Sequence, residues 1–285
     1  MGAIFIPRVA IVTDSTADLP PALVEQWGVT VIPLTINFAV QQYRDGVDLT
    51  SEEFYPLLQA AESLPTSSQP SPAEFQRVYE RLLKDHDSII SIHLSSGLSG
   101  TLQSAAAARD AVDGDVRLFD SRSISLGIGC MVADAVELVR QGRTPNEIIR
   151  QLELARDKTE VLFTLDTLEY LHKGGRIGKV TAVLGTLMNI KPIIRVVNGV
   201  YVPAGKARRL SQALPELVRI FQSISAGRRI RRIAVAHGAA QDAAERLASL
   251  LTEAYRLEPY LLTQVSPVIG VHTGPGTIGA AIQME

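Results

Sequence analysis

The sequence has little cysteine and no long hydrophobic run, and both absences restrict what the protein can be. A single cysteine, Cys130, in 285 residues excludes an internal disulfide and any metal site built from several cysteines. The apolar runs are far shorter than the roughly 18 to 20 residues that a membrane-spanning helix requires. The first residues also lack the charged and then apolar regions of a secretory signal. We therefore expect a cytoplasmic protein without a metal site or a redox function, in which Cys130 is buried.

An excess of charge and the common catalytic motifs are missing as well. The chain has 28 Lys and Arg residues against 30 Asp and Glu, and the formal net charge of -2 gives no general attraction to nucleic acid. Arg228, Arg229, Arg231 and Arg232 form a local basic cluster, which we expect in a solvated turn between a helix and a strand. The sequence contains no P-loop and no Gly-x-Ser-x-Gly nucleophile elbow. These absences argue against a nucleotide-dependent kinase and against a typical α/β hydrolase.

What the sequence does contain is a loop rich in hydroxyls and glycines, at residues 95–101. The apolar run before it predicts a buried strand, and the alanine-rich segment 102–112 predicts a helix. A strand-to-helix turn offers free N–H groups and the positive end of a helix dipole. One serine would suffice for an N-cap, whereas this loop has three serines and a threonine. We expect an anion site here, the alternative being a simple cap formed by Ser96 or Ser99.

Strand and helix patterns alternate through the first half of the chain. Strand patterns at 9–13, 29–38 and 88–94 are separated by helical patterns, which predicts a mostly parallel sheet with helices on both faces. The carboxyl ends of such strands form one polar rim, where α/β proteins bind ligands. The hydroxyls of residues 66–68 either reach this rim or belong to a solvated linker. Ser71 and Thr144 each precede a proline and have a Glu three residues further on, which predicts a capping box at the start of a helix in both places. We place a domain boundary after residue 158, giving two α/β domains, 1–158 and 159–285.

The second half contains cationic segments and one histidine of interest. Residues 173–179 combine three glycines with three cations, so this loop either neutralises an acidic ligand or partner or caps a helix. Asn198-Gly199 predicts a β-hairpin. We expect Lys206, Arg208 and Arg209 to open a helix, where cations oppose the dipole and therefore face a partner. We expect His272 at the end of an apolar strand, within a Gly-Pro-Gly loop.

Taken together, these segments resemble the DegV family of bacterial fatty-acid-binding proteins over residues 9–282. Five motifs carry the resemblance and occur in the family's order: DSTADL from residue 14, TSSQPSP from 66, SSGLSGT from 95, KGGRIG from 173 and GVHTGPG from 270. Each motif is weak alone, but five in order are specific. One departure is Ser67, where the family often has threonine; the hydroxyl is kept, but a methyl contact is lost.

The resemblance implies two α/β domains with a long-chain fatty acid bound between them, and no other cofactor. The fatty-acid carboxylate would be bound by residues of the polar loops, namely Ser67, Ser95, Ser96, Gly97, Ser99, Arg176 and His272. The tail would lie in an apolar tunnel. We expect its wall to include Gly127, Ile128, Gly129, Leu184, Leu187 and Met188, because small and flexible side chains leave room for a long ligand.

The resemblance also implies a carrier rather than an enzyme. In relatives, a separate fatty-acid kinase phosphorylates the bound acid for phospholipid synthesis. We expect Lys206, Arg208 and Arg209 to dock such a kinase, and Arg176 to face either the ligand or that partner. No nucleic-acid partner and at most transient membrane contact are expected.

Two other function classes stay open. One is an esterase or acyltransferase in which Ser95, Ser96 or Ser99 attacks the substrate and His272 is the base. The other is a nucleotide or sugar-phosphate binder that uses the same helix N-terminus, although no acidic residue is placed for a ribose.

Overall fold

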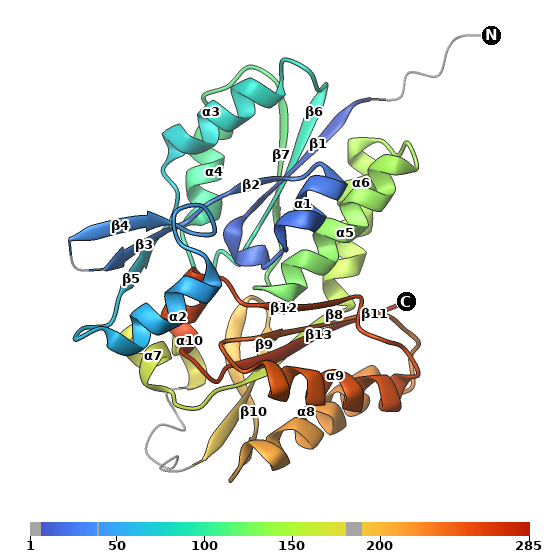
Figure 1. Cartoon of the computed structure of the whole chain (residues 1–285). Helices are drawn as coiled ribbons and strands as arrows, with labels where there is room; N and C mark the ends of the chain where they lie inside the picture. Colours follow the sequence, from blue (N-terminus) through green and yellow to red (C-terminus); the bar gives the residue numbers. More distant parts are fainter. Residues whose placement is uncertain (1–6, 39, 181–189) are drawn as a thin grey trace.

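The computed structural model describes residues 7–38, 40–180 and 190–285 (Figure 1). The first half of the chain forms a four-stranded parallel sheet in the order β2-β1-β6-β7. Its strands are β1 (Val9–Asp14), β2 (Thr30–Ile32), β6 (Ser88–His93) and β7 (Asp115–Asp120). Every residue of β1 and β6 is buried, as expected for central parallel strands covered on both faces.

Helices cover both faces of this sheet, as predicted. One face packs against α3 (Pro72–Leu82) and α4 (Thr101–Arg109), and the other against α5 (Leu126–Arg140) and α6 (Pro145–Asp157), with α1 (Pro21–Trp27) beside α5 (Figure 1). Two of these helices begin with the capping boxes expected from the sequence, at Ser71 and Thr144. Cys130 is buried in α5, which confirms the prediction.

The second half forms a six-stranded mixed sheet in the order β10-β9-β8-β13-β11-β12. Its strands are β8 (Thr159–Thr164), β9 (Lys191–Val197), β10 (Val200–Ala207), β11 (Ile230–His237), β12 (Leu261–Gln264) and β13 (Ile278–Met284). One face is covered by α8 (Leu210–Ser225) and α9 (Gln241–Tyr255), and the other packs against α5. Helix α5 therefore lies between the two sheets (Figure 1). The expected boundary after residue 158 falls between α6 and β8.

A three-stranded antiparallel sheet, β4-β3-β5, adds to the first half, together with α2 (Ser51–Ala60). Its strands are β3 (Thr35–Phe38), β4 (Gln41–Arg44) and β5 (Thr66–Ser68). The prediction of one strand over 29–38 was wrong, because the chain leaves the parallel sheet after Ile32. Pro33 has no N–H to donate to a ladder, so the strand ends there and β3 begins in another sheet. The hydroxyl segment 66–68 forms an edge strand paired with β3, not a linker.

Two predictions in the second half were also wrong. His272 lies in a short helix, α10 (Pro267–Thr273), and not at the end of a strand; Pro267 favours the first turn of a helix. Lys206 belongs to β10, which continues past Val202 through an irregularity between Pro203 and Gly205. Helix α8 begins only at Leu210, so Lys206 does not oppose its dipole. The Asn198-Gly199 hairpin is confirmed.

The largest hydrophobic cluster spans both halves of the chain. It contains Ile36 and Phe54 from the first half, and Phe163, Tyr201 and Val268 from the second. Burial of this many aromatic and branched side chains makes the contact between the halves a core rather than a loose domain interface.

An ionic network also joins the halves. Asp134 and Glu137 on α5 accept hydrogen bonds from Arg232 on β11, and Gln283 on β13 donates to Asp134 at 2.7 Å. Arg231 also pairs with both acids. We expected this arginine cluster in a solvated turn, whereas Arg232 is only 9% exposed.

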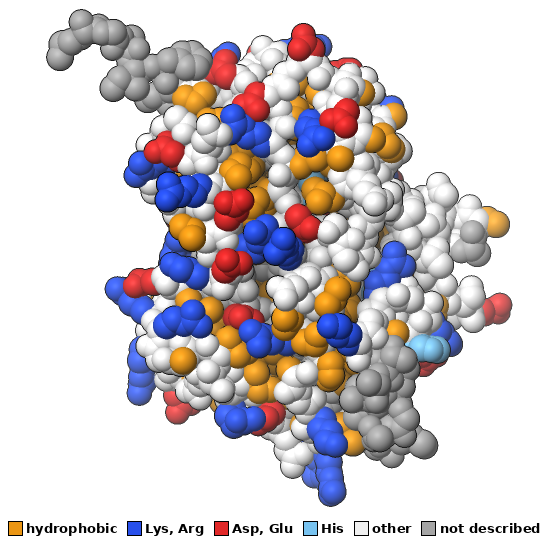
Figure 2. Space-filling view, turned by 180° about the vertical axis from the view of Figure 1, so that it is seen from behind, with side chains coloured by type: hydrophobic (Ala, Val, Ile, Leu, Met, Phe, Trp, Pro, Cys, Tyr) orange, Lys and Arg blue, Asp and Glu red, His pale blue; other side chains and the backbone are white. Residues whose placement is uncertain are grey.

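Elsewhere on the surface, cations and anions are interspersed, as Figure 2 shows for the face opposite to that of Figure 1. This mixture agrees with the low net charge of the chain. No helix in the described part of the chain combines the length and the apolar character needed to span a bilayer.

Candidate functional site

A pocket lies where the two halves of the chain meet, and one side of it is polar. Its cavity volume is about 30 Å³. Its polar lining residues come from β5, from the loops after β1, β6 and α7 (Glu169–Lys173), and from α10. They are Thr16, Ser67, Ser99, Arg176, His272 and Thr273. The fold thus brings together four of the seven predicted site residues, although they are distant in sequence.

A second pocket adjoins the first, and its lining is almost entirely apolar. The two share Ile124, Tyr201, Ile269 and Thr273. Beyond these shared residues, the second pocket is lined by Leu126, Val161, Phe163, Ala236 and Val265, among others. The shared lining places the polar pocket beside the apolar one, so a ligand that occupied both would follow a path that is polar at one end and apolar at the other.

Ser67 and His272 form a hydrogen-bonded pair in the polar pocket, with Ser67 Oγ 2.7 Å from His272 Nε2. Burial and, to a smaller extent, the nearby Arg176 charge together lower the pKa of His272 to about 4. The ring is therefore neutral at pH 7. The tautomer that carries its proton on Nε2 donates to Ser67, which leaves the hydroxyl hydrogen for an acceptor in the pocket.

The other ring nitrogen of His272 faces Gly174. A Cβ at this position would collide with Nδ1, so a glycine is required where the loop passes the ring. Nδ1 is buried and has no hydrogen-bond partner among residues 7–38, 40–180 and 190–285. The loop of glycines and cations that begins at Lys173 thus packs closely against the site histidine.

Arg176 is half-buried and lines the polar pocket. Its Nε donates to the Leu98 carbonyl oxygen at 3.3 Å, and one terminal nitrogen donates to the Gly174 carbonyl oxygen at 2.9 Å. Carbonyl oxygens orient the guanidinium without neutralising it, so its positive charge is kept for an anion. Lys173, in contrast, is exposed and pairs with Glu169 on its own helix.

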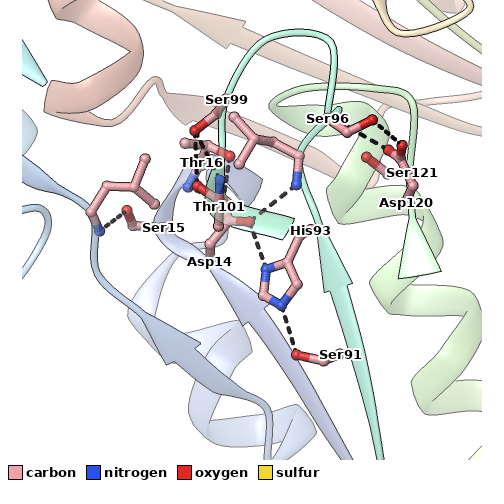
Figure 3. Close-up of polar contacts among 12 residues, drawn as sticks. Asp14, Ser15, Thr16, Ser91, His93, Ser96, Ser99, Thr101, Asp120 and Ser121 are labelled. Carbon is pink, nitrogen blue, oxygen red and sulfur yellow. Dashed lines mark hydrogen bonds and ion pairs between the residues drawn. The ribbon is translucent and has the colours of Figure 1, made fainter. Parts of the chain in front are cut away.

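A buried hydrogen-bond network supports the N-terminal side of the pocket (Figure 3). Asp14 accepts from Thr16 Oγ1 at 2.5 Å, from the Leu94 N–H at 3.1 Å and from His93 Nδ1 at 2.9 Å. His93 in turn contacts Ser91. Thr16 and Leu94 both line the pocket, so Asp14 fixes two parts of its wall. Thr16 belongs to the DSTADL motif, but it was not among the predicted site residues.

The remaining residues of the 95–101 loop have other contacts. Ser95 Oγ donates to the Gly199 carbonyl oxygen at 2.8 Å and accepts from the Gly97 N–H, so both residues attach this loop to the β9–β10 turn. Ser96 is exposed and its Oγ donates to Asp120 at 2.6 Å (Figure 3). Ser95, Ser96 and Gly97 do not line either pocket, whereas Ser99 does. Their role as ligand contacts therefore stays a prediction without geometric support.

The expected tunnel wall also differs. Gly127 packs against Ser123 and Val161, Gly129 approaches the backbone of Ala17, and Ile128 lies in the core beneath the parallel sheet. None of these three lines the two pockets. The neighbouring residues Ile124, Ser125 and Leu126 do so instead. Leu184, Leu187 and Met188 lie outside the described residues.

The predicted partner-binding cations are exposed and do not line the pockets. Lys206 is in β10, while Arg208 and Arg209 precede α8. Their side chains have no ion pair within the described ranges. These cations are therefore accessible to an external anion.

The sheets and pockets define an α/β protein of two sheet units with a polar and an apolar pocket side by side in its interior. The chain belongs to the DegV family: residues 8–285 match the family model described as uncharacterised protein, DegV family. The DegV domain-containing protein of Deinococcus radiodurans is 38% identical over 278 residues, covering 96% of this chain and 98% of the relative. One from Staphylococcus aureus is 38% identical over 272 residues, covering 95% and 97%.

Two solved structures share the fold and are described as binding fatty acids. A DegV family protein from Thermus thermophilus, described by its fatty acid binding, matches with a TM-score of 0.93 and 38% identity, covering 98% of this chain and 100% of that one. DegV from Bacillus subtilis, described as a fatty acid binding protein, matches with a TM-score of 0.89 and 36% identity, with the same coverage. The two-unit α/β fold expected from the sequence is confirmed.

Proposed function

We propose that the protein binds a long-chain fatty acid, with the carboxylate in the polar pocket and the tail in the apolar one. The observation that carries the proposal is that a polar pocket containing a cation adjoins an apolar pocket, the two sharing Ile124, Tyr201, Ile269 and Thr273 in their lining. A ligand that fits this path needs a small anionic group at one end and a long apolar body. The fatty acids described for the Thermus and Bacillus relatives have this chemistry.

The polar pocket supplies what a carboxylate requires. Arg176 offers a positive charge, and the hydroxyls of Ser67 and Ser99 offer donors close to it. The neutral His272 orients Ser67 without adding a second charge that would have to be buried. The apolar pocket stabilises the tail by ~0.8 kcal/mol per buried CH₂, or ~12 kcal/mol for about fifteen carbons before the costs of binding.

We further propose that the protein presents the bound acid to a separate fatty-acid kinase, which forms the acyl phosphate for phospholipid synthesis. The exposed cations Lys206, Arg208 and Arg209 support this role, because they are free to meet an acidic partner or the phosphates that it brings. They lie away from the pocket lining, so docking and ligand binding use different residues.

The esterase alternative has less support. In each of the three candidate serines, Oγ is bonded elsewhere: Ser95 to Gly199, Ser96 to Asp120 and Ser99 to Thr101. The hydroxyl paired with His272 is that of Ser67, and no described residue bonds to the Nδ1 of His272 to orient it as a base.

Native mass spectrometry of the purified protein tests the proposal directly. The expected spectrum shows an added mass equal to that of a long-chain acid, which disappears after delipidation and returns when palmitate is added. Replacement of Arg176 by Ala should reduce the retained lipid, whereas replacement of Ser96, which faces Asp120, should not. A protein that neither retains nor takes up palmitate does not have the proposed function.

A further inference from the structure

Two buried carboxyl groups from the first half of the chain contact the start of α10 in the second half. Asp18 Oδ1 accepts the Ser266 N–H at 2.8 Å, and Asp45 Oδ1 accepts the Val268 N–H at 3.4 Å. Pro267 has no N–H, so the N–H groups of Ser266 and Val268 are the only two that residues 266–268 possess, and each is bound by one of the two carboxyls. Asp18 and Asp45 are 5% and 2% exposed. The two carboxyls thus connect the halves of the chain at one helix end.

Helix α10 is part of the wall of both pockets. Val268, Ile269, His272 and Thr273 line the polar pocket, and Ile269 and Thr273 continue into the apolar one. At its far end, His272 bonds to Ser67. A displacement of α10 would therefore separate that pair and change the apolar path, so whatever holds the helix also holds the ligand site.

Neither carboxyl has a cation as a partner within the described chain. Asp18 receives a hydrogen bond from Ser125 at the start of α5, and the closest arginine to Asp45 in sequence, Arg44, pairs with Asp48. The ionisable groups that act on the pair are Asp14 on β1, near Asp18, and the phenols of Tyr55 on α2 and Tyr201 on β10, which are uncharged. Asp18 itself acts on Asp45.

Burial and these neighbouring acids raise the pKa of both carboxyls. For Asp18 and for Asp45 the pKa is about 7, well above the ordinary value of 3.8, and burial is the main cause in each case. The hydrogen bonds that the two carboxyls accept, including those from the Ser266 and Val268 N–H groups, lower the pKa, but burial outweighs them. A raised pKa means that the folded protein holds protons that the unfolded chain has lost. The contribution of Asp18 and Asp45 to the stability of the folded protein is therefore fully present below about pH 4 and is lost as the pH rises through about 7.

We propose that Asp18 and Asp45 are positioning residues for the ligand site, which hold α10 in place while at least one of them is protonated and release it when both are ionised. Two adjacent buried anions repel each other and gain water if the helix moves away. The inference rests on the proposed function, because the displaced helix would lose the fatty acid. Retention of the ligand thus becomes weaker above neutral pH.

His272 does not account for such a pH dependence. Since its pKa is about 4, its ring is already neutral at pH 6 and stays neutral at higher pH. A change in ligand release between pH 6 and pH 8.5 can therefore be assigned to the two carboxyls and not to the site histidine.

The test measures the release of palmitate from loaded protein to acceptor vesicles at pH 6.0 and pH 8.5. For the natural sequence we expect release about ten-fold faster at pH 8.5, corresponding to about one pKa unit of coupling. In Asp18→Asn and Asp45→Asn the uncharged amide keeps an acceptor for the helix N–H, so the pH dependence should become smaller. It should vanish in the double variant. Asparagine also tolerates the left-handed φ of 51° at position 18.

Asp48→Asn is the matched control. Asp48 lies three residues after Asp45, but it is exposed and its pKa is lowered to about 2 by Arg44, so it is ionised throughout the window. This variant should behave like the natural protein. Equal release at the two pH values in the natural protein, or an unchanged pH dependence in the double asparagine variant, would overturn the proposal.

A second measurement needs neither a variant nor a ligand. Hydrogen exchange of delipidated protein, corrected for the intrinsic pH dependence of exchange, should show protection of residues 268–273 falling between pH 6.0 and pH 8.5. Constant protection of this segment overturns the proposal. If the protein takes up no palmitate at any pH, the proposed function fails, while this exchange experiment still decides whether the two carboxyls hold the helix.

Discussion

Ser67 and His272 lie 2.7 Å apart although 205 residues separate them in the sequence. Ser67 is presented by an edge strand of the small sheet and His272 by the last turn of α10. The pair therefore exists only while the two halves of the chain are packed together. The hydrogen bond that orients the Ser67 hydroxyl in the polar pocket thus depends on the packing of the two halves against each other.

Replacement of Ser67 by Ala should weaken fatty-acid binding by ~1 kcal/mol, or about five-fold, because one hydrogen bond to the carboxylate is lost. Threonine at this position keeps the hydroxyl and should bind nearly normally. Titration of delipidated protein with a fluorescent fatty acid measures the affinity. If Ser67→Ala and Ser67→Thr bind equally well, the hydroxyl does not contact the ligand.

Replacement of Arg176 should have a larger effect, since it removes the charge-assisted contact. We expect Arg176→Ala to lose ~2 kcal/mol, about thirty-fold in affinity. Lys173→Ala is the control, because Lys173 is an exposed cation three residues away that pairs with Glu169. Similar losses in both variants would indicate general electrostatic attraction instead of a defined contact.

Replacement of Ala236 by Val should shorten the acyl chain that the protein accepts. Ala236 lines the apolar pocket, whereas the next residue towards the N-terminus, Val235, faces the opposite side of the sheet. Val235→Ile therefore adds volume away from the path and serves as the control. The lipids extracted from each variant show the change; an identical profile for Ala236→Val would place the tail elsewhere.

Replacement of Arg208 by Glu should leave fatty-acid binding intact but impair phosphorylation by a fatty-acid kinase. The defect should appear mainly in association and become smaller as the ionic strength rises, because salt screens the interaction between exposed charges. Arg246→Glu, an exposed charge reversal on α9, controls for the change in net charge. Normal phosphorylation of the Arg208 variant at low ionic strength would rule out a docking role.

Replacement of Arg232 by Ala should destabilise the protein by ~3 kcal/mol or more, because Asp134 would lose a partner while staying buried. Arg229→Ala removes only an exposed pair with Glu285 and should change the stability little. Urea unfolding monitored by circular dichroism gives both values. An effect of Arg232→Ala as small as that of Arg229→Ala would mean that the network contributes little.

Local signals were sufficient where neighbouring residues decide the structure. The capping boxes at Ser71 and Thr144 and the turn at Asn198-Gly199 depend on side chains within four residues, and all three were predicted. The alternation of strands and helices likewise predicted the parallel sheet.

Predictions failed where the structure of a segment depends on contacts with residues that are distant in the sequence. Residues 66–68 have little strand propensity and become a strand because β3 offers them a partner. Ser95 and Ser99 belong to the same motif, yet one contacts the β9–β10 turn and the other lines the pocket. Only the position of the second half of the chain distinguishes them, and the sequence of the loop does not contain that information.

The position of α5 between the sheets has a consequence for the folding of the chain. Eleven consecutive residues of this helix, Leu126–Val136, are buried, so the helix has no polar face along this stretch that is adapted to solvent. Removal of the second sheet would expose apolar side chains to water. A fragment ending at residue 158 would expose an apolar stripe and leave Asp134 without its arginine partners. The two sheet units are therefore not independent modules joined by a linker, and neither can lose its structure without destabilising the other.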